Sequence, residues 1–369
     1  MELLTLFIFI FLISRLAVSV YNYHSNPRLF VKQNAGSELV SILIPARNEA
    51  TNLPIILNSI LRTQGVHYEI IVMDDHSEDG TYRIASEFAS RHAAIRVLKS
   101  KALKAGWTGK NYCCEQLAEA ARGEYLLFVD ADVCLDPLLL SSALYRLKDQ
   151  NLSLLSLFSK QNMLSLGERS TVPLMHYLLL TLLPLKLILK HPFAIFSAAC
   201  GQFMLFKAEE YRRYRWHERL RGRVAEDLGI MRAVKETGLR GEALMSNGLI
   251  SCRMYRSFGE AIMGFSKNFI APFDYRLSLF VPFVFLLVLG PLLVIYQGDH
   301  FQIFSMLLFI SMIRIYTSKL AGEDWWINVM LHPLQMLSFL VISGMAVQQY
   351  LFKSSNWKGR IVASLPVSN

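Results

Sequence analysis

Long apolar blocks are the feature of this sequence that most restricts its fold. The first runs from Leu3 to Val20, and a helix of that length reaches across the hydrocarbon core of a bilayer. Three more follow near the other end, at Leu277 to Tyr296, Phe301 to Tyr316 and about Val329 to Phe352. The sequence therefore predicts an anchor over residues 1–22, a water-exposed domain over 37–270, about three C-terminal membrane helices over 277–352 and a tail over 353–369.

The first block is predicted to be a retained anchor rather than a cleaved signal peptide. Ala17-Val18-Ser19 resembles a cleavage site, but the residues before the block include Glu2 and no lysine or arginine. Arg28 and Lys32 follow the block, and basic residues favour the cytoplasmic side. We therefore expect a multi-pass protein of the cell (inner) membrane whose domain over 37–270 is cytoplasmic.

The number of C-terminal crossings stays open. Four crossings in all would place the basic tail residues Lys353, Lys358 and Arg360 outside, against the same charge bias. Either the last block, which contains Pro333 and Gly344, does not cross fully, or the tail is an exception. The stretch Val172 to Ala199 is also ambiguous, because its prolines and lysines fit segments in the headgroup plane as well as an ordinary buried helix.

Composition limits the partners. The net charge is +9, which in a chain with membrane blocks favours phosphate ligands or anionic headgroups, and no basic-aromatic motif indicates a nucleic-acid partner. The cysteines lack the spacing of a zinc site or a disulfide framework, which favours a reducing compartment. They are Cys113, Cys114, Cys134, Cys200 and Cys252.

Strand-like and helical runs alternate from Leu39 to about Ser159, which predicts an α/β fold with parallel strands. Asn52 is expected to cap the first helix of this region. The strand-like runs are Val40 to Ile44, Glu69 to Met73 and Tyr125 to Val129. The helical runs are Asn52 to Arg62, Thr81 to Arg91 and Lys110 to Ala121.

Polar residues follow each of these strands, and in such sheets ligands collect at the carboxyl ends of the strands. Asp130 and Asp132 leave a buried strand one residue apart and could hold Mg²⁺ or Mn²⁺, although such a pair is usually only a solvated turn. Asp75 could accept a hydrogen bond from a base or a ribose, whereas Asp74 fits turn chemistry. Arg47 and Glu49 are candidates for a phosphate and a ribose contact, or for a surface ion pair.

Two further charged positions complete the expected site. Lys110 opens a helix and could bind a nucleotide phosphate there, or could simply be solvated. Asp227 follows the basic stretch from Arg212 to Arg223, and cations would keep it ionised, which a general base requires. Helix capping by the acidic pair Glu226-Asp227 is the alternative.

Taken in order, these motifs resemble a family 2 glycosyltransferase of the GT-A fold, a Rossmann-like nucleotide-diphospho-sugar transferase. The resemblance covers roughly residues 39–256 and rests on the segments Ser41 to Glu49, Asp74 to Thr81, Asp130 to Asp132 and Glu226-Asp227. The segments Gly106 to Asn111, Arg253 to Tyr255 and Asn356 to Arg360 are similar to a membrane-bound subgroup associated with carotenoid and hopanoid glycosylation.

The resemblance implies a role for each matching position. It implies that Pro45, Ala46, Glu49 and Asp75 hold the nucleoside and that Lys110 holds the phosphates. It further implies a metal at Asp130 and Asp132, a base at Asp227 and an acceptor-side turn at Cys200-Gly201-Gln202. His76 replaces the glycine that often follows the aspartate pair.

The implied activity is an inverting hexosyl transfer (EC 2.4) of one sugar from a nucleotide sugar, with a UDP-sugar expected, to a hydroxyl or carboxyl of a carotenoid, hopanoid or other isoprenoid lipid. A processive polysaccharide synthase is disfavoured, because the Gln-x-x-Arg-Trp element of such enzymes does not follow Asp227. A non-catalytic nucleotide-binding transporter or scaffold is the alternative from another class. A nucleotidyltransferase would need a glycine-rich loop where Pro45 to Asn48 stands.

Overall fold

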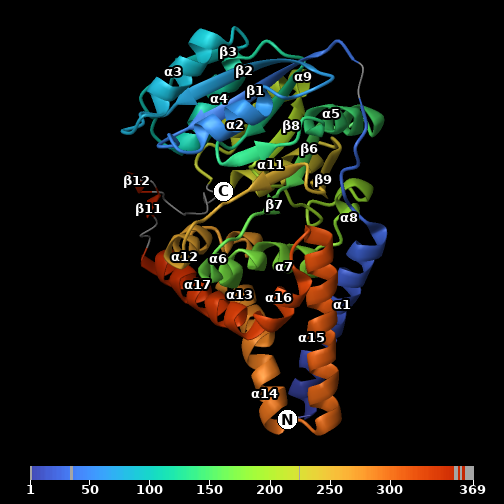
Figure 1. Cartoon of the computed structure of the whole chain (residues 1–369). Helices are drawn as coiled ribbons and strands as arrows, with labels where there is room; N and C mark the ends of the chain where they lie inside the picture. Colours follow the sequence, from blue (N-terminus) through green and yellow to red (C-terminus); the bar gives the residue numbers. More distant parts are fainter. Residues whose placement is uncertain (1, 34–35, 224, 353–355, 358–359, 362–369) are drawn as a thin grey trace.

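Seven strands form the main sheet in the computed structural model, which describes residues 2–33, 36–223, 225–352, 356–357 and 360–361 (Figure 1). In sheet order they are β3 (Ile95–Lys99), β2 (His67–Asp74), β1 (Leu39–Ala46), β4 (Tyr125–Val129), β8 (Phe203–Lys207), β6 (Leu154–Phe158) and β9 (Gly241–Met245). β1 is parallel to β2 and β4, whereas β8 is antiparallel to β4 and β6. The expected mixed α/β fold is confirmed.

Alternating side chains of β1 fill two cores, one on each face of the sheet. Ile42 and Ile44 belong to one buried cluster, and Leu43 belongs to the other. The first core includes residues of α2 (Leu53–Ile60), α3 (Thr81–Arg91) and α5 (Leu139–Asp149). The second includes residues of α4 (Gly109–Ala120), α9 (Ala208–Tyr214), α10 (Trp216–Arg219) and α11 (Glu226–Glu236). Burial on both faces explains the nearly continuous apolar sequence of this strand.

Element bounds follow the sequence pattern closely in this region. The strand at Tyr125–Val129 and the helix at Thr81–Arg91 have the expected bounds, and β1 and β2 are slightly longer than expected. The expected cap at Asn52 is wrong, because the backbone of Asn52 is already helical and its side chain makes no capping bond. Its amide instead donates to Glu49 Oε2 at 2.7 Å. Glu49 therefore has a local partner that steadies its carboxylate.

A small second sheet supports the end of β4. It consists of β5 (Val133–Leu135), β10 (Ile250–Cys252) and β7 (Lys160–Gln161), in that order. β5 begins directly after Asp132, and Cys252 on β10 lies opposite Val133 in the register. The small sheet thus brings a distant part of the chain against the Asp130–Asp132 segment. Two further strands, β11 (Asn356–Trp357) and β12 (Arg360–Ile361), pair with each other.

Four helices of the described chain are long and apolar enough to cross a membrane. They are α1 (Glu2–Ser25), the continuous segment Leu277–Gln297, α15 (His300–Ala321) and α17 (His332–Phe352). The second consists of α13 (Leu277–Val284), the π-helical turn η2 (Phe285–Leu289) and α14 (Gly290–Gln297), and it contains Pro282. Pro291, the second residue of α14, has no N–H to donate to the Leu287 carbonyl four residues earlier, which accounts for the irregular turn before it.

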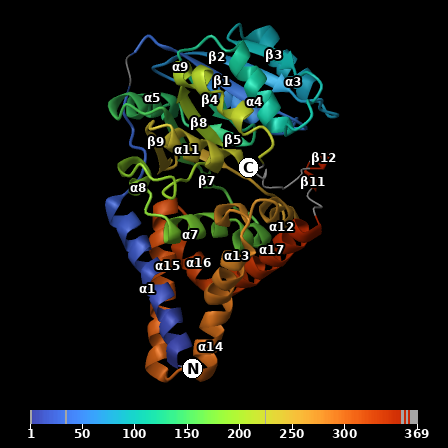
Figure 2. The ribbon, with the colours of Figure 1, turned by 180° about the vertical axis from the view of Figure 1, so that it is seen from behind.

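The long helices do not all run in one direction. α1, α14 and α15 extend away from the α/β domain, whereas α17 runs obliquely beneath that domain in both views (Figures 1 and 2). Shorter helices lie at the level of α17, between the domain and the ends of the long helices. They are α6 (Leu166–Thr171), α7 (Pro173–Leu182), α12 (Phe258–Ser266) and α16 (Trp325–Met330), and the 3-10 turn η1 (Ala271–Phe273) precedes α13 in the chain.

The ambiguous stretch from Val172 to Ala199 divides into two parts. α7 packs against α1 and α15 with Tyr177 only 2% exposed, so this part follows the buried-helix alternative rather than the headgroup-plane one. α8 (Lys186–Lys190) packs against β9, and Phe193 and Ile195 after it are 63% and 79% exposed. The tail residues Lys353 and Lys358 lie outside the described residues.

Candidate active site

Acidic side chains from three elements lie along the carboxyl edge of the main sheet. Asp75 follows β2, Asp130 and Asp132 follow β4, and Glu226 and Asp227 begin α11. We call these five residues the acidic rim. Parallel strands present their carboxyl ends at one edge, so side chains far apart in the sequence become neighbours there.

Asp75 is held by both neighbouring strands. Its backbone N–H donates to the Ala46 carbonyl at 2.8 Å, and the Arg47 guanidinium donates to the Asp75 carbonyl at 2.9 Å. The Ser100 hydroxyl donates to the Asp75 carboxylate at 3.1 Å. These contacts fix a carboxylate that is 7% exposed next to Pro45 and Ala46, at the end of β1.

The residues that flank Asp75 shape the turn. Asp74 Oδ2 accepts a hydrogen bond from the Ser77 N–H at 3.3 Å, which is the turn chemistry expected for Asp74. His76 has a φ of 54°, in the left-handed region that glycine adopts most readily. The departure at His76 therefore leaves the turn conformation in place, at the expense of some backbone strain.

Lys110 bridges two residues of the acidic rim. Its ammonium group lies 2.9 Å from Asp130 Oδ1 and 3.2 Å from Glu226 Oε1. Burial opposes the charge, but the carboxylates of Asp130 and Glu226 raise the pKa of Lys110 well above its usual value. The N-cap hydroxyl of Thr108 accepts from the Asn111 N–H and fixes the start of α4. Lys110 is thus a paired cation in this structure, with 38% of its side chain exposed.

Asp227 lies on the other side of this bridge. Its Oδ2 accepts a hydrogen bond from the Gly201 N–H at 3.1 Å, and its Oδ1 accepts from the Leu228 N–H at 2.8 Å. Burial first, and then the Glu226 charge, raise the pKa of Asp227 to about 6. A carboxylate with that pKa is ionised at neutral pH and is more basic than an ordinary aspartate.

The expected electrostatic reason for the ionisation of Asp227 is wrong. Arg212 donates to the backbone carbonyls of Ala121 and Gly123. Arg215 pairs with Glu115 and Glu119 on α4. Lys110 is the cation that lowers the pKa of Asp227. Arg212 and Arg215 therefore stabilise the fold around α4, α9 and α10.

Gly201 lies close to the Lys110 ammonium group and to Asp227. A side-chain carbon at this position would lie 3.0 Å from Lys110 Nζ and 3.8 Å from Asp227 Oδ2. Glycine therefore lets the backbone N–H reach Asp227 without displacing the lysine. This contact joins the Cys200-Gly201-Gln202 turn, which the sequence places on the acceptor side, to the candidate base.

Asp132 is the most perturbed carboxylate of the rim. Burial, the Asp130 charge and the Glu49 charge raise its pKa to about 7, and the Cys252 thiol donates to it. Its Oδ1 is buried with no hydrogen-bond partner among the described residues. Gln202 supports the same place, because its amide donates to Cys252 Sγ at 3.1 Å and its carbonyl accepts from the Ser159 hydroxyl.

The residues predicted for the site therefore form two groups. Ala46, Arg47 and Asp75 are in contact around β1 and β2. Lys110, Asp130, Gly201 and Asp227 form the second group, and Gln202 reaches Asp132 through Cys252. The link between the groups is electrostatic, since Glu49 raises the pKa of Asp132.

The acidic rim offers hard oxygen ligands for a divalent ion. Two carboxylates leave one strand end, and the unpartnered Oδ1 of Asp132 fits a cation that would satisfy it. The described residues contain no group of three histidine, cysteine or acidic side chains that could hold a metal alone. A Mg²⁺ or Mn²⁺ ion at Asp130 and Asp132 would need further oxygens from water or a ligand.

Three contacts of the site were not predicted from the sequence. Glu226 pairs with Lys110, Cys252 donates to Asp132, and Ser100 donates to Asp75. Glu226 could have been suspected from the sequence, because it directly precedes the candidate base Asp227. Cys252 and Ser100 carry no local signal, because only the small sheet and β3 bring them to the rim.

Comparison with known proteins gives three results. The model of the family described as glycosyl transferase family 2 matches residues 41–214. Two similar proteins are named 4,4'-diaponeurosporenoate glycosyltransferase. The one from Staphylococcus haemolyticus (strain JCSC1435) is 38% identical over 106 residues, covering 28% of this chain and 27% of the relative. The one from Staphylococcus aureus (strain USA300) is 36% identical over 100 residues, covering 27% and 25%.

A solved structure extends the likeness of the fold. The mannosyltransferase PcManGT from Pyrobaculum calidifontis, in complex with GDP-Man and Mn²⁺, has a TM-score of 0.56 and 14% identity. The likeness covers 95% of this chain and 99% of that one, so it includes the long helices. By contrast, the matched region spans about a quarter of the length of the two staphylococcal relatives.

Proposed function

Residues 41–214 form a family 2 glycosyltransferase domain, and from this premise we propose that the chain is a membrane-bound inverting glycosyltransferase. It moves one sugar from a nucleotide sugar to a hydroxyl or carboxyl of a lipid acceptor. The observation that carries the proposal is the acidic rim, where a basic carboxylate, a paired lysine and a strand-end aspartate pair meet in a chain that also has four long apolar helices.

The donor would lie along the carboxyl ends of β1 and β2. Asp75 is fixed by Ser100 and by the ends of two strands, so it presents a rigid acceptor for a base or ribose N–H or O–H. Glu49, steadied by Asn52, supplies a second acceptor at the same edge. A UDP-sugar is the proposed donor, since the imide N–H of uracil suits a carboxylate.

The diphosphate would lie near Lys110 and the strand-end aspartates. Asp130 and Asp132 are the residues that would hold Mg²⁺ or Mn²⁺. When bound, such an ion supplies charge neutralisation for the departing diphosphate. Lys110 holds Asp130 and Glu226 in the ligand-free chain, and its ammonium group is close enough to exchange one carboxylate for a phosphate oxygen.

Asp227 would act as the general base. Its Oδ2 is held by the Gly201 N–H, and its pKa near 6 leaves it ionised at neutral pH. An acceptor hydroxyl gives its proton to Asp227 while its oxygen bonds to the anomeric carbon. The bond from that carbon to the diphosphate breaks, and the electron pair leaves with the nucleoside diphosphate. One displacement inverts the anomeric configuration.

The acceptor would come from the membrane. The relatives are named for a carotenoid carboxylate, 4,4'-diaponeurosporenoate, which supports an apolar acceptor with one oxygen nucleophile. Four apolar helices support attachment to the cell membrane, with the α/β domain on the cytoplasmic side. The cytoplasmic side is proposed because Arg28 and Lys32 follow α1, and basic residues favour that side of the membrane.

A membrane assay tests the proposal. Membranes with the protein are incubated with UDP-glucose, Mn²⁺ and a long-chain isoprenoid alcohol, and nucleotide products are separated from lipid products. We expect UDP and a lipid with one added sugar, and we expect the activity to disappear in excess chelator and in Asp132→Asn. Ser90→Ala on the exposed face of α3 is the matched control and keeps full activity.

Other products would select another function. Pyrophosphate in place of UDP would indicate a nucleotidyltransferase, and a growing polymer would indicate a processive synthase. Nucleotide binding without turnover, over a panel of donor sugars and lipid alcohols and acids, would favour the scaffold or transporter. Full activity in excess chelator would contradict the metal site at Asp130 and Asp132.

A further inference from the structure

The last two helices pose a geometric problem. α17 has 21 residues, so it is about 31 Å long, which matches the hydrocarbon core of a bilayer. A helix of that length crosses only if it runs nearly along the membrane normal. α17 instead runs obliquely to α15 in both views (Figures 1 and 2).

Side-chain contacts fix the depth at which α17 begins. His332, its first residue, accepts a hydrogen bond at Nδ1 from Arg314 Nε at 2.9 Å. Arg314 lies seven residues before Ala321, the domain-side end of α15. At 1.5 Å per residue, α17 therefore begins only about 10 Å from the level at which α15 ends.

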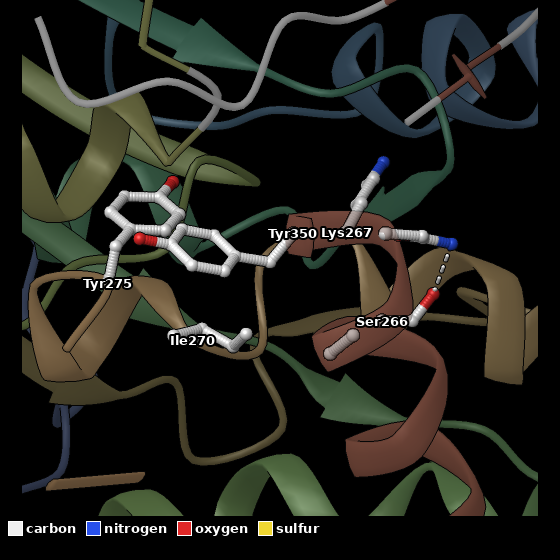
Figure 3. Close-up of a pocket in the computed structure, with 7 residues that line it drawn as sticks. Ser266, Lys267, Ile270, Tyr275 and Tyr350 are labelled. Carbon is white, nitrogen blue, oxygen red and sulfur yellow. Dashed lines mark hydrogen bonds between the residues drawn. The ribbon is translucent and has the colours of Figure 1, made fainter. Parts of the chain in front are cut away.

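Other contacts show that α17 rises from that depth. Phe339, near its middle, packs against Phe283, which is six residues into α13. Gln349 donates to the Ser266 hydroxyl at 3.0 Å, and Tyr350 stacks on Tyr275 with ring centroids 6.2 Å apart (Figure 3). Tyr275 precedes α13 on the side of the α/β domain. The last residues of α17 thus lie near the level at which α13 begins, on the side of that domain.

The short helix α16 leads from the level at which α15 ends to the greater depth at which α17 begins. It joins the domain-side end of α15 to the start of α17, and polar side chains pin it there. Asn328 donates to Ser318 Oγ at 2.9 Å and to Glu323 at 2.8 Å, and Gln335 donates to Asn328 Oδ1 at 2.9 Å. These bonds fasten α16 to the end of α15 and to the first turn of α17 through side chains.

The face of α16 and α17 that points away from the rest of the protein is apolar and exposed. Trp326 and Met330 on α16 are 58% and 73% exposed, and Leu337 and Val341 on α17 are 59% and 49% exposed. The inward face of α17 carries the buried polar residues Gln335, Ser338 and Ser343 together with the buried apolar residues Met336, Phe339 and Ile342. An exposed apolar face on helices that lie at shallow depth suits the lipid of one leaflet.

We infer that α16 and α17 form a re-entrant pair, which enters the leaflet on the side of the α/β domain and returns to that side. This inference rests on the proposed membrane attachment, not on the proposed chemistry. The partner of the exposed face is the lipid of that leaflet, and the protein crosses the bilayer three times, through α1, α13–α14 and α15. Of the two alternatives left open by the sequence, this selects an incomplete last crossing.

Cysteine labelling in sealed membrane vesicles tests the inference. The background is Cys134→Ser, because the other four cysteines are buried. Single cysteines replace Ser90 on α3, Gln297 at the far end of α14 and Phe352 at the end of α17. With a membrane-impermeant maleimide, we expect Phe352→Cys to react in the same vesicle orientation as Ser90→Cys and in the opposite one to Gln297→Cys. Reaction of Phe352→Cys together with Gln297→Cys would overturn the inference.

Spin labels give a second measurement that does not depend on reagent access at the end of α17. Nitroxides at Leu334, Val341 and Leu351 are compared for accessibility to oxygen and to a water-soluble nickel chelate. A re-entrant helix predicts that the oxygen-to-nickel ratio falls steadily from Leu334 to Leu351. A maximum at Val341 would show a complete crossing. Neither readout requires enzymatic activity, so a failure of the proposed function would not affect them.

Discussion

The acidic rim and the membrane end of the protein both bury charge, but they stabilise it in opposite ways. At the rim, Lys110 is shared by Asp130 and Glu226, and Asp132 keeps an unpartnered oxygen among the described residues. At the membrane end, the guanidinium groups of Arg15 and Arg314 lie 4.6 and 3.5 Å from the ring centroid of Tyr177. We call Arg15, Tyr177 and Arg314 the basic cluster.

The acidic rim is therefore suited to binding ligands, whereas the basic cluster holds helices together. Burial first, and then like charges held close together, raise the pKa values of Asp132 and Asp227, and these carboxylates remain available to a cation or a substrate proton. The basic cluster instead joins α1, α7 and α15, because Arg15 also donates to the Thr181 hydroxyl at 2.9 Å. Changes at the rim should therefore alter turnover, and changes in the basic cluster should alter stability.

The largest expected effect is that of Asp227→Asn. With an isoprenoid alcohol, kcat should fall about 10³-fold, because the proton acceptor is lost while donor binding is kept. With an isoprenoid carboxylic acid the loss should be far smaller, since a carboxylate is already ionised at neutral pH. Steady-state rates with the matched pair of acceptors measure this. Equal losses with both acceptors would make Asp227 a positioning residue, and unchanged turnover of the alcohol would exclude it as the base.

The next effect concerns the basic cluster. Tyr177→Leu removes the ring between two guanidinium groups and should lower the free energy of unfolding by about 2 kcal/mol. Tyr177→Phe keeps the ring and is the matched control, so it should stay near the wild-type value. Denaturant unfolding in detergent measures both. If phenylalanine were as damaging as leucine, the cation–ring contacts would not be the cause.

The pH dependence of alcohol glycosylation reports on the rim. The pKa of Asp227 is raised to about 6, so the base is ionised above that pH and protonated below it. With donor and metal saturating, kcat should be level above about pH 7 and should fall about tenfold per pH unit below about pH 5. A rate that stayed constant down to pH 4 would contradict the raised pKa.

The smallest effect is expected at the donor end of the rim. Ser100→Ala removes one hydrogen bond to Asp75, worth about 1 kcal/mol, so the donor KM should rise about fivefold while kcat stays the same. A fall in kcat without a change in KM would place Ser100 with the chemical step instead. Ser86→Ala, whose hydroxyl bonds only its own helix backbone, is the control.

Local pattern predicted the front half of the α/β domain because its signals are short-range. Apolar runs bounded by turn residues located β1, β2 and β4, and their ends located Asp75, Asp130 and Asp132. The antiparallel β8 and the small sheet were not predicted, because their pairing joins segments far apart in the chain. The partners of Asp132 depend on that pairing, and they remained hidden for the same reason.

Charge state was the least predictable property. The arginines near Asp227 in sequence point to carbonyls and glutamates elsewhere, while Lys110, more than a hundred residues earlier, lies close to it. Sequence proximity misassigned the cations because electrostatic energy depends on distance in space and on burial.

The sequence by itself determined the α/β domain, the four apolar helices and the order of acidic motifs that resembles family 2, because each is encoded in neighbouring residues. The tertiary structure alone decided which lysine pairs with the rim, which glycine frees an N–H for Asp227, and how α17 is inclined. These properties arise from contacts between segments far apart in the chain, and such contacts form only when the sheets and helices have packed together.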